Sequence, residues 1–347
     1  MIQSLLAMKT RVEYIDLAKG YGIIAIMAWH AHLAPFFSFH YMKFWVLPMF
    51  FLLSGVFAKT NVAFKELIKR DVKRFFVPML FYNAIFFILN VLFTILLPDQ
   101  YSFFNPIKKA INPFGFMNGP LWFVWALFFM DIIHWGLARF FENNHLKIFF
   151  SALILSAVVF HLNKFVIFNH HIRLPLNLDV ALTSYLFYSL GFSLKDFILL
   201  KRPLPVFIHL LIVCGYIILN IYNSSDNRSM AVNAYDFNWF VFISKSLLGT
   251  FTFLFLFYVI EKLKVFSWLG WFGMKSLHFL GLHYVFIPCY LFVLPSLASI
   301  PSWEKYSFFI LFILFSSLIV LLYDSYLKRT ETWLGNKVSS YILNSKR

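Results

Sequence analysis

The chain has 347 residues, of which 61% are hydrophobic and 13% are charged, and its mean hydropathy is +0.75. Soluble domains carry about 25% charged residues, so this composition excludes an ordinary water-soluble domain. The net charge of +15 would indicate nucleic-acid binding in a soluble protein, but here the charges lie between apolar runs, as membrane topology requires. We therefore expect an all-α, polytopic transmembrane bundle surrounded by membrane lipid, with no nucleic-acid partner.

The chain start and the cysteines add little. Residues 1–9 are weakly apolar and no small-residue cleavage site follows them, so we expect no cleaved signal peptide. Cys214 and Cys289 both fall inside apolar runs, which indicates neither a disulfide nor a metal site.

Ten segments have the length and apolar character of membrane-spanning helices, each of which needs roughly 20 mostly apolar residues. They lie at about 14–35, 43–58, 75–97, 119–140, 147–163, 177–194, 204–222, 239–260, 273–295 and 305–326. The fifth is short and the sixth is the least hydrophobic, so nine crossings remain an alternative. We expect one membrane domain over residues 1–347, without an internal repeat.

The basic residues predict the orientation of these segments. With the N-terminus inside and ten crossings, twenty of the 30 Lys and Arg residues fall in inner segments and seven in outer segments. Lys19, Lys245 and Lys275 lie within the spans. Because basic residues accumulate on the cytoplasmic side, both termini are expected inside, and an odd number of crossings would contradict this arrangement.

The first span carries an unusual polar stripe. On a helix, His30 lies about 20° from Lys19 and about 40° from Asp16 around the axis, and roughly 21 Å beyond Asp16 along it. Ionisable residues inside a membrane are costly and therefore candidates for function. His30 is either a reacting group or a histidine that bonds a neighbouring helix, and the span alone favours neither interpretation.

A basic helix precedes the third span. Arg70, Lys73 and Arg74 share one face at i, i+3 and i+4. Such a cluster binds phosphate, because an Arg guanidinium presents a planar fork to it. The simpler interpretation is an ordinary cytoplasmic flank that touches anionic lipid.

The fourth span opens with Asn118-Gly119-Pro120-Leu121-Trp122-Phe123, which predicts a sharp helix start and places Trp122 at the outer interface. An aromatic belt explains Trp122 equally well. Further along, Asp131 and His134 share one face of this span, and we interpret them as a buried structural pair.

The ninth span contains Ser276 and His283, which lie about 20° apart on one helical face. His283 is therefore a polar group in the middle of the membrane, as a partner of a reacting residue or as a packing hydrogen bond.

Together these features resemble the acyltransferase 3 family of integral membrane acyltransferases, in particular its fucose 4-O-acetylase-like branch. The resemblance spans nearly the whole chain in the right order. The matching residues are Asp16, Lys19, Gly20 and His30; Pro48 to Gly55; Arg70 to Pro78; Gly119 to Phe123; and Ser276 with His283.

The resemblance implies transfer of an acyl group, usually acetyl, from cytoplasmic acetyl-CoA to a sugar hydroxyl of a cell-surface glycan or its lipid-linked precursor. It implies His30 as the reacting histidine, with Asp16 and His283 in the catalytic site. It also implies Lys19, Arg70, Lys73 and Arg74 as contacts to the donor, and Trp122 and Ser276 as contacts to the substrate. The spacing of the ionisable residues predicts no metal site. The location implied is the inner membrane of a bacterium.

The chain departs from the family pattern at two places. Val46 stands where related sequences carry a His, and Arg70 is followed three residues later by Lys73 rather than by a second Arg. Lys is a point charge, so the residue that holds the phosphate is left open. A secondary transporter or glycan flippase is the alternative function, since ten spans with intramembrane charges fit that class too.

Overall fold

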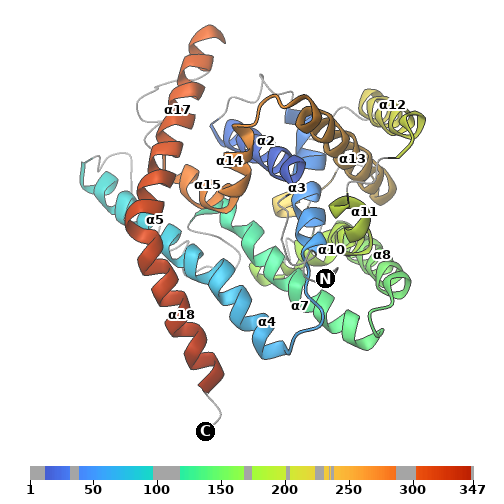
Figure 1. Ribbon diagram of the computed structural model, residues 1–347, viewed down its shortest axis with the longest axis horizontal. Coiled ribbons are helices and arrows are strands. Elements are labelled where there is room, and N and C mark those ends of the chain that lie inside the picture. Colours follow the sequence, from blue (N-terminus) through green and yellow to red (C-terminus); the bar gives the residue numbers. More distant parts are fainter. Residues whose placement is uncertain are drawn as a thin grey trace, which may run out of the picture.

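The structure, a computed structural model, describes residues 12–31, 39–96, 118–167, 174–200, 204–222, 230–233, 235, 238–286 and 302–344. All regular structure within these residues is helical (Figure 1). The longer helices are α2 (Glu13–His30), α3 (Phe39–Val56), α5 (Val77–Leu96), α7 (Trp122–Phe140), α8 (His145–Leu162), α10 (Leu178–Ser193), α12 (Val206–Tyr222), α13 (Trp239–Leu263), α17 (Ser302–Leu322) and α18 (Lys328–Asn344). The shorter ones are α4 (Phe64–Asp71), α11 (Lys195–Leu199), α14 (Leu269–Met274) and α15 (Ser276–Leu282), with single turns η2 (Val72–Phe76), η3 (Gly119–Leu121), η4 (Asn163–Ile167), η5 (Pro175–Asn177), η6 (Met230–Val232), η7 (His283–Phe286) and η8 (Tyr323–Leu327).

Helix covers most of the described part of each of the ten expected segments. Residues 32–35 of the first, 97 of the third and 287–295 of the ninth lie outside the described residues. Five described helices are long and apolar enough to cross a membrane: Phe64–Leu92, Gly119–Phe140, His145–Phe165, Trp239–Leu263 and Tyr306–Ile342. The all-helical class and the membrane character are thus confirmed, whereas ten crossings and their direction stay predictions.

The polar first helix α2 lies inside the bundle. It packs against α3, α13, α14 and α15, and most of its side chains are buried (Figure 1). Glu13, Asp16 and Lys19 give it more charge than a lipid-facing helix tolerates. Enclosure by protein therefore allows this helix to keep its charged stripe.

Close helix crossings hold this centre together. A Cβ atom added to Gly20 of α2 would overlap the carbonyl oxygen of Leu269 on α14, and one added to Gly273 would overlap the carbonyl oxygen of Asp16. Small residues let backbones approach where lipid provides no hydrophobic driving force. The two glycines thus allow the backbone of α14 to lie directly against α2, beside its charged residues.

The ninth expected span is not one continuous helix. Helix α14 begins at Leu269, before the expected start at 273, and the chain leaves the helical conformation at Lys275, with φ −101° and ψ 13°. Helix α15 then begins at Ser276. A break of this kind re-aims the side chains on either side of it.

The last helix continues well past the expected end at 326. Helix α17 runs through the single π turn η8 into α18, which reaches Asn344. Helix α18 packs against α4, η2 and α5, so the end of the chain lies beside the basic helix (Figure 1).

Candidate active site

A pair of histidines forms the centre of the candidate site. The rings of His30, at the end of α2, and His283, at the start of η7, have centroids 5.1 Å apart. Tyr284 lies 5.4 Å from His30, in an edge-to-face arrangement. The structure therefore brings together the two histidines that the sequence singled out, although 252 residues separate them along the chain.

The hydrogen bonds of His283 define its tautomer. Its Nδ1 lies 2.6 Å from the carbonyl oxygen of Phe279, and a carbonyl can only accept, so Nδ1 carries the proton. The other ring nitrogen, Nε2, is buried and has no hydrogen-bond partner among the described residues. His283 consequently holds a free lone pair beside His30.

The start of the fourth span supports this end of the site. The amide of Asn118 donates to the carbonyl oxygen of Gly281 at 2.7 Å, and Gly119 lies against the ring of Tyr284. Asn118 therefore anchors the backbone two residues before His283. This is the physical reason for a motif that the sequence showed only as a helix start.

A cavity of about 170 Å³ runs along the middle of α2. Its polar lining residues are Lys19, Ser54, Arg74 and Ser276; its apolar lining residues are Ile23, Ile26, Leu47, Phe50, Phe75, Phe123, Leu127, Met274, Leu277 and Leu280. Ile26 lies one helical turn before His30, and Leu280 one turn before His283. The cavity thus extends from Lys19 and Arg74 to within one helical turn of His30 and His283, neither of which is among its lining residues.

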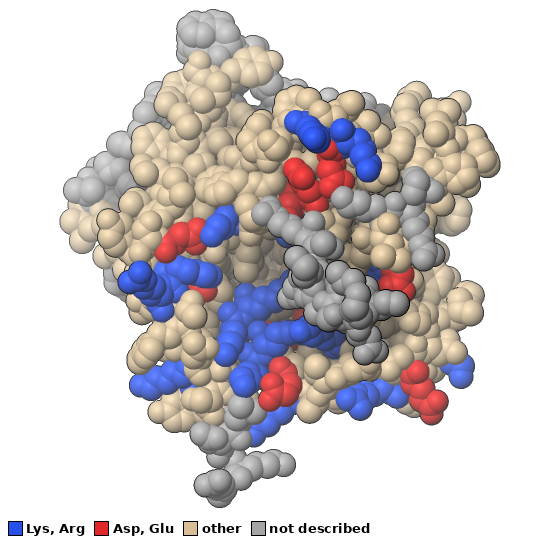
Figure 2. All heavy atoms as spheres, in the orientation of Figure 1, with Lys and Arg blue, Asp and Glu red and all other residues tan. Residues whose placement is uncertain are grey.

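Basic side chains lie together on the face of the molecule that Figure 2 shows. In Figure 2, Lys and Arg residues lie over α4, beside a hollow at the centre of the view. Arg74 is exposed and lines the cavity, and Lys19 forms an ion pair with Asp16 across 3.8 Å. Asp16 therefore steadies a cation at the cavity, about 21 Å along α2 from His30.

The other two basic candidates face elsewhere. Arg70 contacts the carboxylates of Asp71 at 2.9 Å and Asp131 at 2.8 Å. The hydroxyl of Tyr188 donates to Asp131 as well. Lys73 donates to the amide oxygen of Asn336 on α18 at 2.8 Å. Neither Arg70 nor Lys73 is among the cavity-lining residues.

The expected pair of Asp131 and His134 is divided between two networks. Asp131 belongs to the Arg70 network, whereas Nδ1 of His134 lies 2.8 Å from the hydroxyl of Tyr185. Sequence reasoning missed both tyrosines of α10, because nothing local shows that α10 packs on α7. Tyrosines 185 and 188 lie on one helical face, and that spacing was the only available signal.

Trp122 contributes indirectly to the cavity. Its ring packs edge-to-face against Phe123 at 5.8 Å, and Phe123 is the residue of this motif that lines the cavity. Phe123 in turn stacks on Phe51 of α3 at 4.7 Å. The motif therefore shapes an apolar wall.

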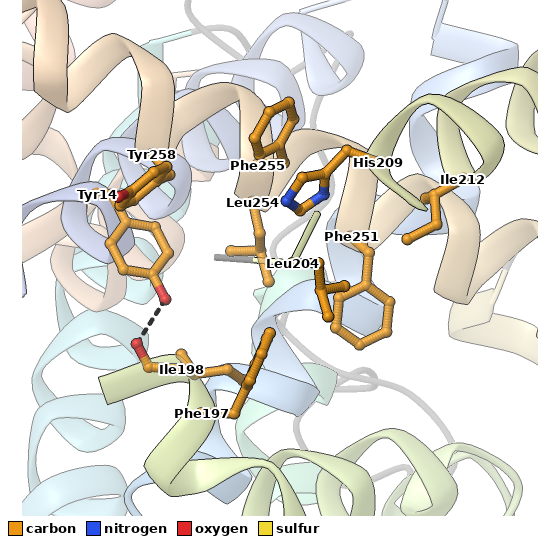
Figure 3. A pocket seen from close by; sticks show the side chains of 10 residues that line it. All are labelled: Tyr14, Phe197, Ile198, Leu204, His209, Ile212, Phe251, Leu254, Phe255 and Tyr258. Atoms are coloured by element: carbon orange, nitrogen blue, oxygen red, sulfur yellow. Dashed lines mark hydrogen bonds between the residues drawn. The ribbon is translucent and has the colours of Figure 1, made fainter. Parts of the chain in front are cut away.

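A second, smaller cavity of about 70 Å³ lies between α2, α11, α12 and α13 (Figure 3). Its lining is almost entirely apolar, and the hydroxyl of Tyr14 at its edge donates to the carbonyl oxygen of Ile198 at 2.9 Å. His209 stacks on Phe255 with centroids 3.6 Å apart. None of the predicted site residues lines this cavity. Within the described chain, no group of three or more His, Cys, Asp or Glu side chains is arranged to hold a metal ion.

Comparison with known proteins gives one match. The model of the acyltransferase 3 family, described as an acyltransferase domain, matches residues 12–323. No curated protein and no solved structure matches the chain.

Proposed function

The chain belongs to the acyltransferase 3 family and is a membrane acyltransferase, and from that premise we propose that it acetylates a sugar. The donor is cytoplasmic acetyl-CoA, and the acceptor is a hydroxyl of a cell-surface glycan or its lipid-linked precursor. The location is the inner membrane of a bacterium, with ten crossings and both termini on the donor side. Within the family, we assign the chain to the fucose 4-O-acetylase-like branch on the motifs of its sequence.

One observation supports this proposal above the others: a single cavity runs from cations toward a histidine pair. Coenzyme A has a polyanionic nucleotide end and a long, thin pantetheine arm. Arg74 and Lys19 supply positive charge at the cavity, and its walls are otherwise mostly apolar. A guanidinium suits phosphate oxygens, and Ser276 offers a hydroxyl to an amide of the arm.

The chemistry then falls to the histidine pair. One histidine nitrogen accepts the proton of the acceptor hydroxyl while the oxygen of that hydroxyl attacks the carbonyl carbon of the thioester. The carbon–sulfur bond breaks, and the leaving thiolate takes the proton. His30 is proposed as this base, or as a transient carrier of the acetyl group. His283 accepts a hydrogen bond from protonated His30 through the lone pair on Nε2 and so stabilises its charge.

The remaining candidate residues support this arrangement from a distance. Asp16 positions Lys19 and does not touch the reacting atoms, because it lies at the far end of α2. Arg70 and Lys73 hold the basic helix in place through their contacts to Asp131 and Asn336. Trp122 supports the apolar wall of the cavity through Phe123.

Arg74→Ala is expected to weaken binding of coenzyme A about ten- to a hundredfold, the effect of losing one hydrogen bond to a charged group. Binding is measured by the ligand-dependent shift in thermal unfolding of the purified protein. Arg139→Ala is the matched control, since Arg139 is also exposed but donates to the carbonyl of Val62, away from the cavity. Equal affinities of the two variants would remove Arg74 from the donor site.

The overall reaction is tested by mass spectrometry of surface polysaccharides from cells with and without the protein. We expect one acetyl group to appear on one sugar only when the protein is present. An unchanged glycan, together with a purified protein whose unfolding temperature ignores coenzyme A and its thioesters, would overturn the proposal.

A further inference from the structure

One wall of the cavity contains the break between α14 and α15. Both Met274 and Ser276 line the cavity, although they are two residues apart. On a continuous helix such residues point about 200° apart and cannot line the same space. The non-helical conformation of Lys275 is what turns both side chains to one side.

The side chain of Lys275 is held by a residue of the turn between α17 and α18. Its Nζ lies 2.5 Å from the carboxylate of Asp324, and both side chains are largely shielded from solvent, at 30% and 22% exposed. Asp324 belongs to η8, a single π turn between α17 and α18. Such turns recur at functional sites because they re-aim side chains.

A second anchor lies one turn further along α15. His278 Nδ1 is 2.5 Å from the hydroxyl of Tyr82 on α5, and its Nε2 is 3.5 Å from Nζ of Lys328. Lys328 is in turn paired with the buried carboxylate of Glu331 at 2.6 Å. Helix α15 is therefore fastened at two points, Lys275 and His278, to the segment that follows α17.

The charges of this cluster balance one another. Lys275 and Lys328 are matched by Asp324 and Glu331, each at salt-bridge distance. A balanced cluster attracts a polyanion far less than free cations do. The arrangement favours a positioning role over direct binding of a ligand.

We infer that Asp324, through its ion pair with Lys275, is a positioning residue that sets the shape of the donor cavity at Met274 and Ser276. The inference rests on the proposed function for its consequence in catalysis. Asp324, Lys328 and Glu331 all lie beyond residue 323, where the match to the family ends, so the family match does not cover them.

The first test measures the accessibility of the cavity wall in the absence of any donor. Ser276→Cys is introduced in a protein whose own thiols are removed by Cys214→Ser and Cys289→Ser, and the rate of maleimide labelling is measured. Adding Asp324→Asn is expected to change this rate by about threefold or more, because the wall is no longer held. An unchanged rate would overturn the inference, whatever the donor proves to be.

The second test measures the effect of the same ion pair on catalysis. Asp324→Asn and Lys275→Met are each expected to lower kcat/KM for acetyl-CoA about tenfold, the scale of a small misplacement of a site wall. The exchange Lys275→Asp with Asp324→Lys restores most of the loss, because it rebuilds the pair with reversed charges. Asp196→Asn, an exposed carboxylate at the start of α11, is the control expected to match the parent protein.

The outcomes distinguish a failure of this inference from a failure of the proposed function. A large loss in Lys275→Met with no loss in Asp324→Asn and no rescue by the exchange would assign Lys275 to the donor itself and overturn the inference. A parent protein that ignores coenzyme A would overturn the proposed function, and the labelling test would still decide the role of Asp324.

Discussion

Replacing His30 with Ala is expected to abolish most of the transfer activity, by about 10²- to 10⁴-fold, the range for loss of a general base. Binding of coenzyme A should stay within about twofold of the parent protein, because Lys19 lies about 16 Å along α2 from His30 and Arg74 belongs to a different helical segment, η2. The measurement is acetylation of the glycan by membranes that contain equal amounts of each protein, with donor affinity determined in parallel.

His161→Ala provides the control for this substitution. His161 is an exposed histidine near the end of α8 and lies outside both cavities, so its loss should leave activity unchanged. Rapid acid quenching followed by mass spectrometry distinguishes the two roles of His30, since an acetylated ring appears only if His30 carries the group. Full activity of a correctly inserted His30→Ala protein would refute both roles.

Replacing Arg70 with Ala is expected to destabilise the fold by about 3–5 kcal/mol, because a buried ion pair loses one partner. Asp71 and Asp131 are both buried, and Arg70 is the cation that contacts each of them within 3 Å. Without it, two neighbouring carboxylates lie in a low-dielectric environment, where the charged form is costly. The measurement is thermal unfolding of the purified protein without ligand.

Comparison with Arg74 makes this prediction specific. Arg74→Ala should unfold at nearly the parent temperature while it loses donor affinity, since Arg74 is exposed. Arg70→Lys should fall between the parent and Arg70→Ala, because Lys keeps the charge but cannot bridge two carboxylates with a planar fork. A stable Arg70→Ala protein with selectively weakened coenzyme A binding would return Arg70 to the phosphate site.

The helices were largely predictable from the sequence. The eighth segment, expected at 239–260, is α13 over Trp239–Leu263, and the fourth, expected at 119–140, is η3 with α7 over the same residues. Both follow from runs of apolar residues, which are local. The break of the ninth segment at Lys275 was not predicted, and the side chain of Lys275 is paired with Asp324 from a different helix.

The site was predictable in part. The helical period alone placed Lys19 and His30 on one stripe, and the structure puts Lys19 in the lining of the cavity and His30 beside His283. The helical period could not show which basic side chain of the basic helix reaches the cavity. Arg70 and Arg74 share one face, yet Arg70 is paired with carboxylates and Arg74 lines the cavity.

By itself, the sequence determined the all-helical membrane class, the positions of most helices and the stripe that carries His30, because apolar length and helical period are properties of neighbouring residues. Only the tertiary structure decided which ionisable groups meet. Asp131 pairs with Arg70, Asp324 with Lys275, and Nε2 of His283 is left with a free lone pair beside His30. The physical reason is that a charge in a low-dielectric interior acts through its nearest partner, and helix packing chooses that partner from residues far apart in the chain.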